Sequence, residues 1–132
     1  MYINLESDYA VRIVICLCQS DGRMDAKRIS EQTAVPQRFA LKILRKLVSA
    51  QIIQSFKGAK GGYCVKRSPH EIDLLEIIEV VEGRYCFSRC LDNKHPCDGW
   101  CKGKGCKVQN IYSKISNMVR DELSAITIDT LL

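Results

Sequence analysis

The stretch VPQRFALKILRKLVSAQIIQSFKGAKGGYCVKR, residues 35–67, decides the fold. Val35-Pro36 places a proline at the favoured first position of a helix, after which apolar residues recur at helical spacing. The predicted inward stripe consists of Phe39, Ala40, Ile43, Leu44, Leu47 and Val48. The opposite face is polar and cationic with one exposed leucine, and it consists of Gln37, Arg38, Leu41, Lys42 and Arg45. This pattern predicts an amphipathic helix with a basic outer face.

A two-stranded hairpin with a glycine-rich tip is predicted immediately after this helix. Residues 52–57 and 63–67 have the composition of short strands, and the glycine-rich run 58–62 lies between them. Glycines such as Gly61 permit positive φ angles and a close approach to a phosphate or a minor groove, where Lys57 and Lys60 would add positive charge. The run lacks the Gly-Lys-Ser/Thr ending of a nucleotide-binding loop, so we interpret the hairpin as a wing.

Two further helices are predicted upstream. One begins near Ser7-Asp8 and ends near Gly22, and a short one capped by Asp25 runs through Ile29 to Thr33. The short helix and the basic helix would form a helix-turn-helix. Arginine and glutamine can contact base edges in the major groove and lysine can neutralise phosphates, which favours a DNA-reading face over an ordinary solvated one.

The distribution of charge supports this interpretation. The net charge of the 132 residues is +5, but residues 1–70 hold 12 Lys and Arg against 5 Asp and Glu, whereas residues 71–132 hold 8 against 10. A basic first half predicts a polyanionic partner, most simply double-stranded DNA. No apolar run approaches the length of a membrane span, and the first residues lack an export pattern. We therefore expect a cytoplasmic protein that binds no membrane. Because 132 residues fit one compact domain, we also expect that it is not an enzyme.

The second half is predicted to build a helix over residues 72–81 and a long final helix. Apolar residues at three- and four-residue steps give the long helix a nearly coiled-coil seam, formed by Val108, Ile111, Ile115 and Met118. The first helix of the same chain could cover this seam. We favour a homodimer, because two-fold pairing matches palindromic operators. The hydrophobic tail 126–132 would then pack on the partner.

Together these elements predict a mainly α fold with a small two-stranded wing. A winged helix-turn-helix DNA-binding domain would occupy residues 1–83, a cysteine-rich metal-binding loop residues 84–106, and a dimerisation helix with its tail residues 107–132.

Cysteines crowd into the predicted loop, where Cys90, Cys97, Cys101 and Cys106 fall within seventeen residues. In a reducing compartment this favours metal binding over disulfides, and thiolates select iron-sulfur clusters or zinc. A structural zinc site including Cys86 is the alternative, and His95 could ligate either metal. Three other cysteines lie in predicted helix or strand and are expected to act as small hydrophobes, namely Cys16, Cys18 and Cys64.

Taken in order, the elements resemble the winged-helix regulators of the IscR and NsrR type. The resemblance covers essentially the whole chain and is carried by residues 7–12, 29–31, 35–44 and 57–63, and by a last cysteine followed by a long helix. It implies an iron-sulfur cluster of two or four irons, with Cys90 as first ligand, Cys106 as last and either Cys97 or Cys101 between them. Some members add an aspartate donated across the dimer, and Asp8 stands at that position. Alternatively, the four loop thiolates complete the ligand set alone, and Asp8 only complements the helix dipole.

The resemblance implies a homodimeric transcription regulator, expected to be a repressor, whose operator affinity is controlled by the cluster. The signal would be cluster supply, nitric oxide, oxygen or redox state. The alternatives are a winged-helix regulator with zinc or no metal, which responds to a partner protein or to thiol oxidation, and a small electron carrier. The basic helix and wing argue against the electron carrier.

Overall fold

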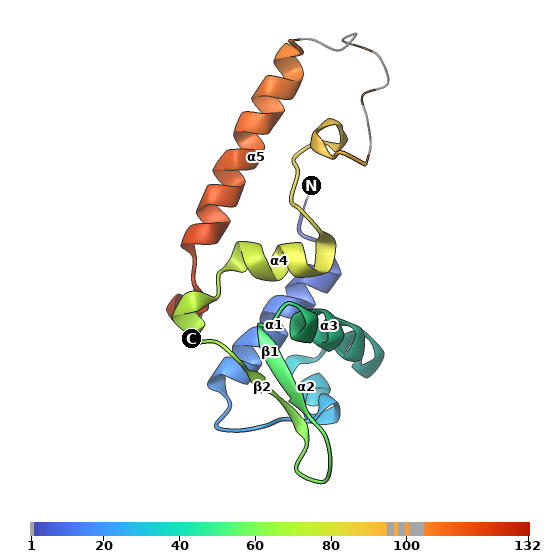
Figure 1. The fold of residues 1–132 in the computed structure, drawn as a ribbon, viewed down its shortest axis with the longest axis vertical. Helices are drawn as coiled ribbons and strands as arrows, with labels where there is room; N and C mark the ends of the chain where they lie inside the picture. Colours follow the sequence, from blue (N-terminus) through green and yellow to red (C-terminus); the bar gives the residue numbers. More distant parts are fainter. Residues whose placement is uncertain (1, 95–96, 98–99, 101–104) are drawn as a thin grey trace.

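The computed structural model describes residues 2–94, 97, 100 and 105–132 (Figure 1). Helices dominate the described chain, and its one sheet has two antiparallel strands. In chain order the elements are α1 (Leu5–Gln19), α2 (Ala26–Thr33), α3 (Gln37–Ser49), β1 (Ile53–Phe56), β2 (Gly62–Val65), η1 (Pro69–Glu71), α4 (Leu74–Glu82), η2 (Arg89–Leu91), α5 (Lys107–Ala125) and η3 (Ile128–Leu131). The predicted fold, a mainly α winged helix with a long C-terminal helix, is confirmed.

Local capping sets where the first helices begin. Helix α1 begins earlier than predicted because the Asn4 side chain accepts a hydrogen bond from the Ser7 amide at 2.9 Å. Asp25 caps α2 as predicted, through a 2.8 Å bond from the Arg28 amide. Pro36 occupies the N-cap of α3 rather than its first turn, so that prediction was wrong by one residue.

The core lies where α1, α2, α3 and α4 meet beneath the wing. Its members are fully or almost fully buried apolar side chains, and they include Ile13, Leu17, Ile29, Ile43, Leu44, Leu47, Ile52, Ile72 and Ile77. The predicted inward stripe of α3 needs two corrections. Phe39 is 39% exposed and Val48 is only half-buried, because both lie at the edge of the stripe rather than at its centre.

The wing is attached to the helix-turn-helix by backbone hydrogen bonds. Ile53 pairs with Val65 and Phe56 with Gly62 in the antiparallel register. Met24, between α1 and α2, exchanges two hydrogen bonds with Tyr63, of 3.0 Å and 2.8 Å. These bonds attach the α1–α2 connection to strand β2 of the hairpin.

Helix α5 projects away from the helical core, whereas the chain after it returns to the core (Figure 1). Ile128 is completely buried, and its amide donates to the Ile72 carbonyl at 2.9 Å. The prediction that the whole tail packs on a partner was therefore wrong for Ile128, although Leu131 and Leu132 remain exposed. Among the described helices, none has the length and apolarity to cross a membrane.

Candidate DNA-binding face and cysteine segment

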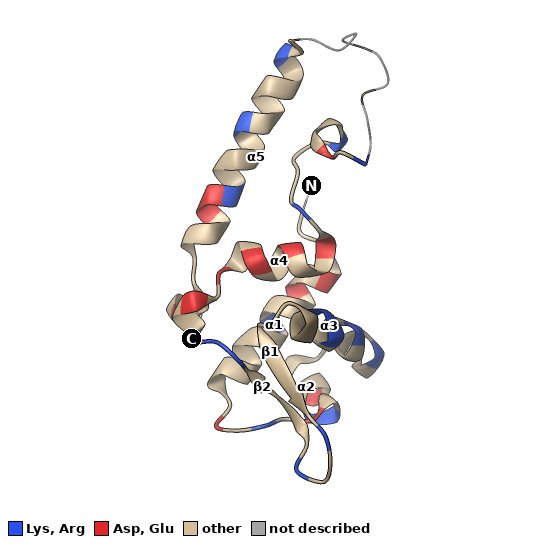
Figure 2. Ribbon diagram, in the orientation of Figure 1, with Lys and Arg blue, Asp and Glu red and all other residues tan. Residues whose placement is uncertain are grey.

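Helix α3 is rich in basic residues (Figure 2), and most of them lie on its exposed face. Gln37, Arg38, Lys42 and Arg45 are all exposed, as the sequence predicts, whereas Leu41 is half-buried and not the exposed leucine expected. The Arg38 guanidinium lies 4.9 Å from the centre of the Phe39 ring. This cation–π contact favours one orientation of an exposed side chain.

The basic face also has an acidic neighbour within the chain. The Glu6 carboxylate, from the first turn of α1, lies 2.8 Å from Lys46 Nζ and 3.6 Å from Lys42 Nζ. Lys46 Nζ additionally donates to the Val81 carbonyl at 3.0 Å. Lys46 therefore joins the last turn of α3 to both α1 and the end of α4.

Lys57 and Lys60 of the wing are exposed, and Figure 2 shows basic residues at the tip of the hairpin. Gly61 has a structural reason to be glycine, because a Cβ there would lie 2.6 Å from the Phe56 carbonyl oxygen and 2.9 Å from that of Gly58. The hairpin itself therefore requires Gly61, whether or not nucleic acid approaches it.

The start of the cysteine segment is docked along α5. The Phe87 amide donates to the buried Ser116 hydroxyl at 2.6 Å, and the Phe87 ring lies 5.2 Å from the Tyr112 ring. Gln109 then links the two outer cysteines of the segment: its side chain donates to the Cys90 carbonyl at 3.0 Å, and its amide donates to Cys106 Sγ at 3.4 Å. The first and last predicted cluster ligands are thus tied to one residue of α5.

The predicted ligand set is only partly placed. Cys90 and Cys106 are half-buried and Cys97 is exposed, whereas Cys101 and the alternative ligand His95 lie outside the described residues. Within the described part of the chain, no three His, Cys, Asp or Glu side chains converge as metal ligands. The thiols of Cys90 and Cys106 fit an iron-sulfur cluster or zinc by their chemistry.

Two other candidate ligands have neighbours of their own. Asp8 forms an ion pair with Arg12 at 2.6 Å, one turn along α1, and half of its side chain is exposed. Cys86, the extra thiol of the zinc alternative, is half-buried beside Gly83 and Phe87. Because Asp8 lies in the first turn of α1, its charge also favours the helix dipole, as the simpler interpretation requires.

The C-terminal end of α4 connects the cysteine segment with the helix-turn-helix. The Glu82 carboxylate accepts from the completely buried Ser7 hydroxyl and from the Asn4 amide at 3.2 Å. One turn earlier, Glu79 accepts from the Tyr85 amide at 3.0 Å and forms an ion pair with Arg120 of α5. Residues 79–85 therefore hold α1, α5 and the start of the cysteine segment together.

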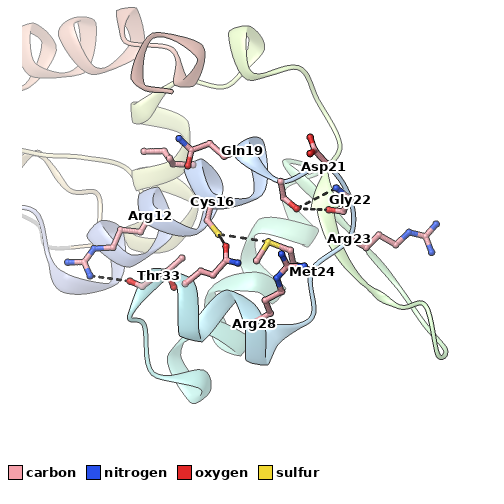
Figure 3. Close-up of a pocket in the computed structure, with 12 residues that line it drawn as sticks. Arg12, Cys16, Gln19, Asp21, Gly22, Arg23, Met24, Arg28 and Thr33 are labelled. Carbon is pink, nitrogen blue, oxygen red and sulfur yellow. Dashed lines mark hydrogen bonds between the residues drawn. The ribbon is translucent and has the colours of Figure 1, made fainter.

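A cavity of about 670 Å³ opens between α1 and α2 (Figure 3). Cys16 lies on its wall, with its sulfur 3.9 Å from Met24 Sδ and 3.5 Å from Gln32 Oε1. Burial raises the pKa of the Cys16 thiol, although the nearby Arg28 guanidinium lowers it in part, and burial alone raises the pKa of Cys18. Neither thiol is thus activated as a nucleophile.

Sequence reasoning missed Arg23. Its guanidinium stacks on the Phe56 ring, 3.4 Å from the ring centre, and donates to the Lys60 carbonyl at 3.1 Å. The sequence shows only an arginine in a polar connection, so no local signal points to the wing.

A helix-turn-helix with a basic second helix and an attached wing defines the winged-helix class of DNA-binding proteins.

The chain belongs to the Rrf2 family, described as iron-dependent transcriptional regulators, whose family model matches residues 3–132. It is 25% identical to the HTH-type transcriptional regulator IscR of Pectobacterium carotovorum, over 100% of this chain and 79% of that protein. These relationships identify a DNA-binding transcriptional regulator, and they confirm the prediction that the protein is not an enzyme.

Two solved structures have the same fold. The IscR structure from T. potens superposes with a TM-score of 0.78 and 22% identity, and the match covers 99% of this chain and 85% of that chain. The structure of CymR, the global cysteine regulator of B. subtilis, also gives a TM-score of 0.78 with 22% identity, over 99% of this chain and 95% of that chain. The winged-helix assignment thus rests on solved relatives as well as on the elements seen here.

Proposed function

We propose that this regulator is a cytoplasmic homodimer, acting as a repressor, whose affinity for a palindromic operator depends on an iron-sulfur cluster held by residues 84–106. The observation that carries the proposal is the chain of contacts from the cysteines to the reading helix. Gln109 holds Cys90 and Cys106 on α5, Glu79 joins α5 to the end of α4, and Lys46 joins that end to α3. A change at the cysteines therefore has a path of packed elements to the basic face.

We assign operator contacts to the basic face of α3 and to the wing tip. Gln37 and Arg38, in the first turn of α3, would read base edges, and Lys42 and Arg45 would hold phosphates, with Leu41 packing beside them. Lys57 and Lys60 would contact phosphates or the minor groove, with the backbone of Gly61 close by. Residues 1–83 would thus form the reading unit.

Dimerisation is assigned to residues 107–132. Val108, Ile111 and Met118 are each about half exposed or more in the single chain, at 49%, 58% and 59%. Exposed apolar residues along one helix favour a protein partner. Tyr2, Ile3 and Leu5 add further exposed apolar surface at the start of the chain. A second copy of the chain is the occupant that matches a palindromic operator.

The cluster would be held by Cys90 and Cys106 with Cys97 or Cys101, and Asp8 of a partner copy is the candidate fourth ligand. A bound cluster would supply an iron-sulfur centre that reacts with oxygen, nitric oxide or electron donors, or that is lost when cluster supply fails. The chain's own part is to hold the thiols at the N-terminal end of α5, where Cys106 caps the helix. A change in the state of the cluster would alter the Cys106 cap of α5 and the hydrogen bonds of Gln109 with Cys90 and Cys106.

The deciding measurement is the content of iron, acid-labile sulfide and zinc per chain in protein purified without oxygen. Stoichiometric iron and sulfide that disappear in Cys90→Ser and Cys106→Ser, but persist in the matched control Cys64→Ser, would establish the cluster. Separate replacement of Cys97 and Cys101 by serine would identify the middle ligand. A loss of cluster without any change in operator affinity would refute the control of DNA binding.

A regulator with structural zinc or no metal is the second candidate. It is favoured by the likeness to CymR, the global cysteine regulator of B. subtilis. Zinc without sulfide would support it. DNA binding would then respond to a partner protein or to thiol oxidation, which a titration with oxidant and reductant would reveal.

A further inference from the structure

Arg23 bridges two parts of the wing from outside it. The residue lies in the connection between α1 and α2, and its side chain is directed out of the α1–α2 cavity, away from Cys16 (Figure 3). The guanidinium carbon lies 3.4 Å from the centre of the Phe56 ring, at the end of β1. One of its nitrogens donates to the Lys60 carbonyl, at the tip, at 3.1 Å.

The wing needs such a contact because it is small. Its strands have four residues each, and residues 57–60 are all exposed. A two-stranded hairpin of this size is marginally stable alone. Backbone pairing with Met24 holds β2 at Tyr63, but that pairing ends before the tip. Arg23 extends the attachment to Lys60.

We infer that Arg23 is a positioning residue that holds the wing in its DNA-binding conformation, acting through Phe56 and Lys60 and not through a phosphate contact of its own. The inference rests on the proposed function, in which Lys60 meets DNA. By fixing the Lys60 carbonyl, Arg23 fixes the backbone from which the lysine ammonium extends. Part of the cost of ordering the tip is then met before DNA arrives.

The shape of the guanidinium group distinguishes this positioning role from neutralisation of a DNA phosphate by a positive charge. A planar guanidinium can stack on a ring and donate in its own plane at the same time, whereas a lysine ammonium cannot reproduce that combination. Arg23→Lys therefore keeps the positive charge and removes the combined contact with the Phe56 ring and the Lys60 carbonyl. Phe56→Leu removes the ring and keeps the charge.

The first measurement is amide hydrogen exchange in the free protein, compared between wild type, Arg23→Lys, Arg23→Ala and Phe56→Leu. The Gly61 amide is the tip amide to follow, because it donates to the Gly58 carbonyl at 2.9 Å. We expect its exchange to rise about tenfold in both Arg23 variants and by a smaller factor in Phe56→Leu, since each loses one or both contacts. Exchange in the core of α1 should stay unchanged, which excludes general destabilisation. Lys27→Ala removes an exposed cation from α2 and is the matched control, expected to leave the wing unchanged. Unchanged exchange at the tip in Arg23→Ala would overturn the inference.

The second measurement is affinity, as a function of salt, for a duplex that the wild-type protein selects from a random library. We expect Arg23→Lys to bind several-fold more weakly than wild type with the same salt dependence. If Arg23→Lys binds like wild type, while Arg23→Ala loses affinity and about one unit of salt slope, Arg23 is a phosphate contact and the inference is wrong. Failure of the wild type to select any duplex would refute the proposed function. Faster exchange at the wing tip in the Arg23 variants would still show that Arg23 holds the wing.

Discussion

Replacing Lys46 by methionine should destabilise the protein, although the residue lies near the surface. Methionine keeps most of the side-chain stem and removes the ammonium group. Lys46 Nζ donates to the Val81 carbonyl at 3.0 Å and to Glu6 Oε1 at 2.8 Å, and 33% of the side chain is exposed. The substitution thus leaves one carbonyl in the last turn of α4 and one carboxylate in the first turn of α1 without this partner.

The two contacts of Lys46 contribute different amounts to the free energy of unfolding. A hydrogen bond from a charged donor contributes about 1.5–3 kcal/mol, and the partial exposure of Lys46 argues for the lower limit of about 1.5 kcal/mol for the Val81 contact. The ion pair with Glu6 is partly screened by water and adds about 0.5 kcal/mol. Lys42 Nζ remains 3.6 Å from Glu6 Oε1 and limits that loss. The expected decrease in the free energy of unfolding is about 2 kcal/mol.

Urea unfolding followed by circular dichroism, at one fixed protein concentration, tests this value. With a slope of about 2 kcal/mol/M, the midpoint should fall by about 1 M. A double-mutant cycle with Glu6→Gln should give a coupling energy of about 0.5 kcal/mol, since most of the Lys46 contribution goes to the backbone. A midpoint that moves by less than about 0.2 M would show that Lys46 is an ordinary surface cation, and the reasoning would be refuted.

Three further predictions concern other parts of the fold. Gly62→Ala should lower the free energy of unfolding by about 2 kcal/mol or more in urea titrations, because φ is +138° and the new Cβ would lie 2.8 Å from the Met24 carbonyl oxygen, whereas Gly22→Ala, with open space around it, should be nearly neutral. Burial raises the pKa of Cys18, so the rate of its alkylation should keep rising above the pH at which an ordinary thiol is fully ionised, and an alkylation profile that levels off at the usual pKa would contradict this. Because the pKa of Cys18 is higher in the folded than in the unfolded chain, the neutral thiol favours the folded state at low pH. This contribution to stability is lost as the pH rises through the raised pKa. Ser116→Ala should speed hydrogen exchange of the Phe87 amide about fivefold, because it removes a 2.6 Å bond to a buried hydroxyl, while exchange in α2 should not change.

Much of the fold could be predicted because local patterns specify it. Helical spacing places α3, and Asp25 caps α2 through an interaction that spans three residues. The glycine-rich run 58–62 marks the hairpin tip. Errors occurred where two local signals compete: Ser7-Asp8 looks like a helix start, but Asn4 is the cap, and Ser7 is buried against Glu82 instead.

The contacts that build the site could not be predicted in the same way. Lys46 and Val81 are 35 residues apart, and Arg23 and Lys60 are 37 apart. Each of these residues is an unremarkable polar or apolar residue within its own segment. Their partners are chosen by how the helices pack, and helical periodicity states which face of a helix is apolar without stating which neighbour will cover it.

The C-terminal tail shows what that limit means for function. An apolar tail after an apolar seam predicts that both meet the same partner, yet Ile128 enters the core of its own chain and the Leu74 amide donates to the Ile126 carbonyl at 3.0 Å. These contacts fix the base of α5 against α4, and the ion pair between Arg120 and Glu79 adds a second attachment. The seam thus projects from a joint built within one chain. If two copies pair through that seam, the separation of their reading helices is set by this joint, and Ser116, one turn before Arg120, holds the start of the cysteine segment next to it.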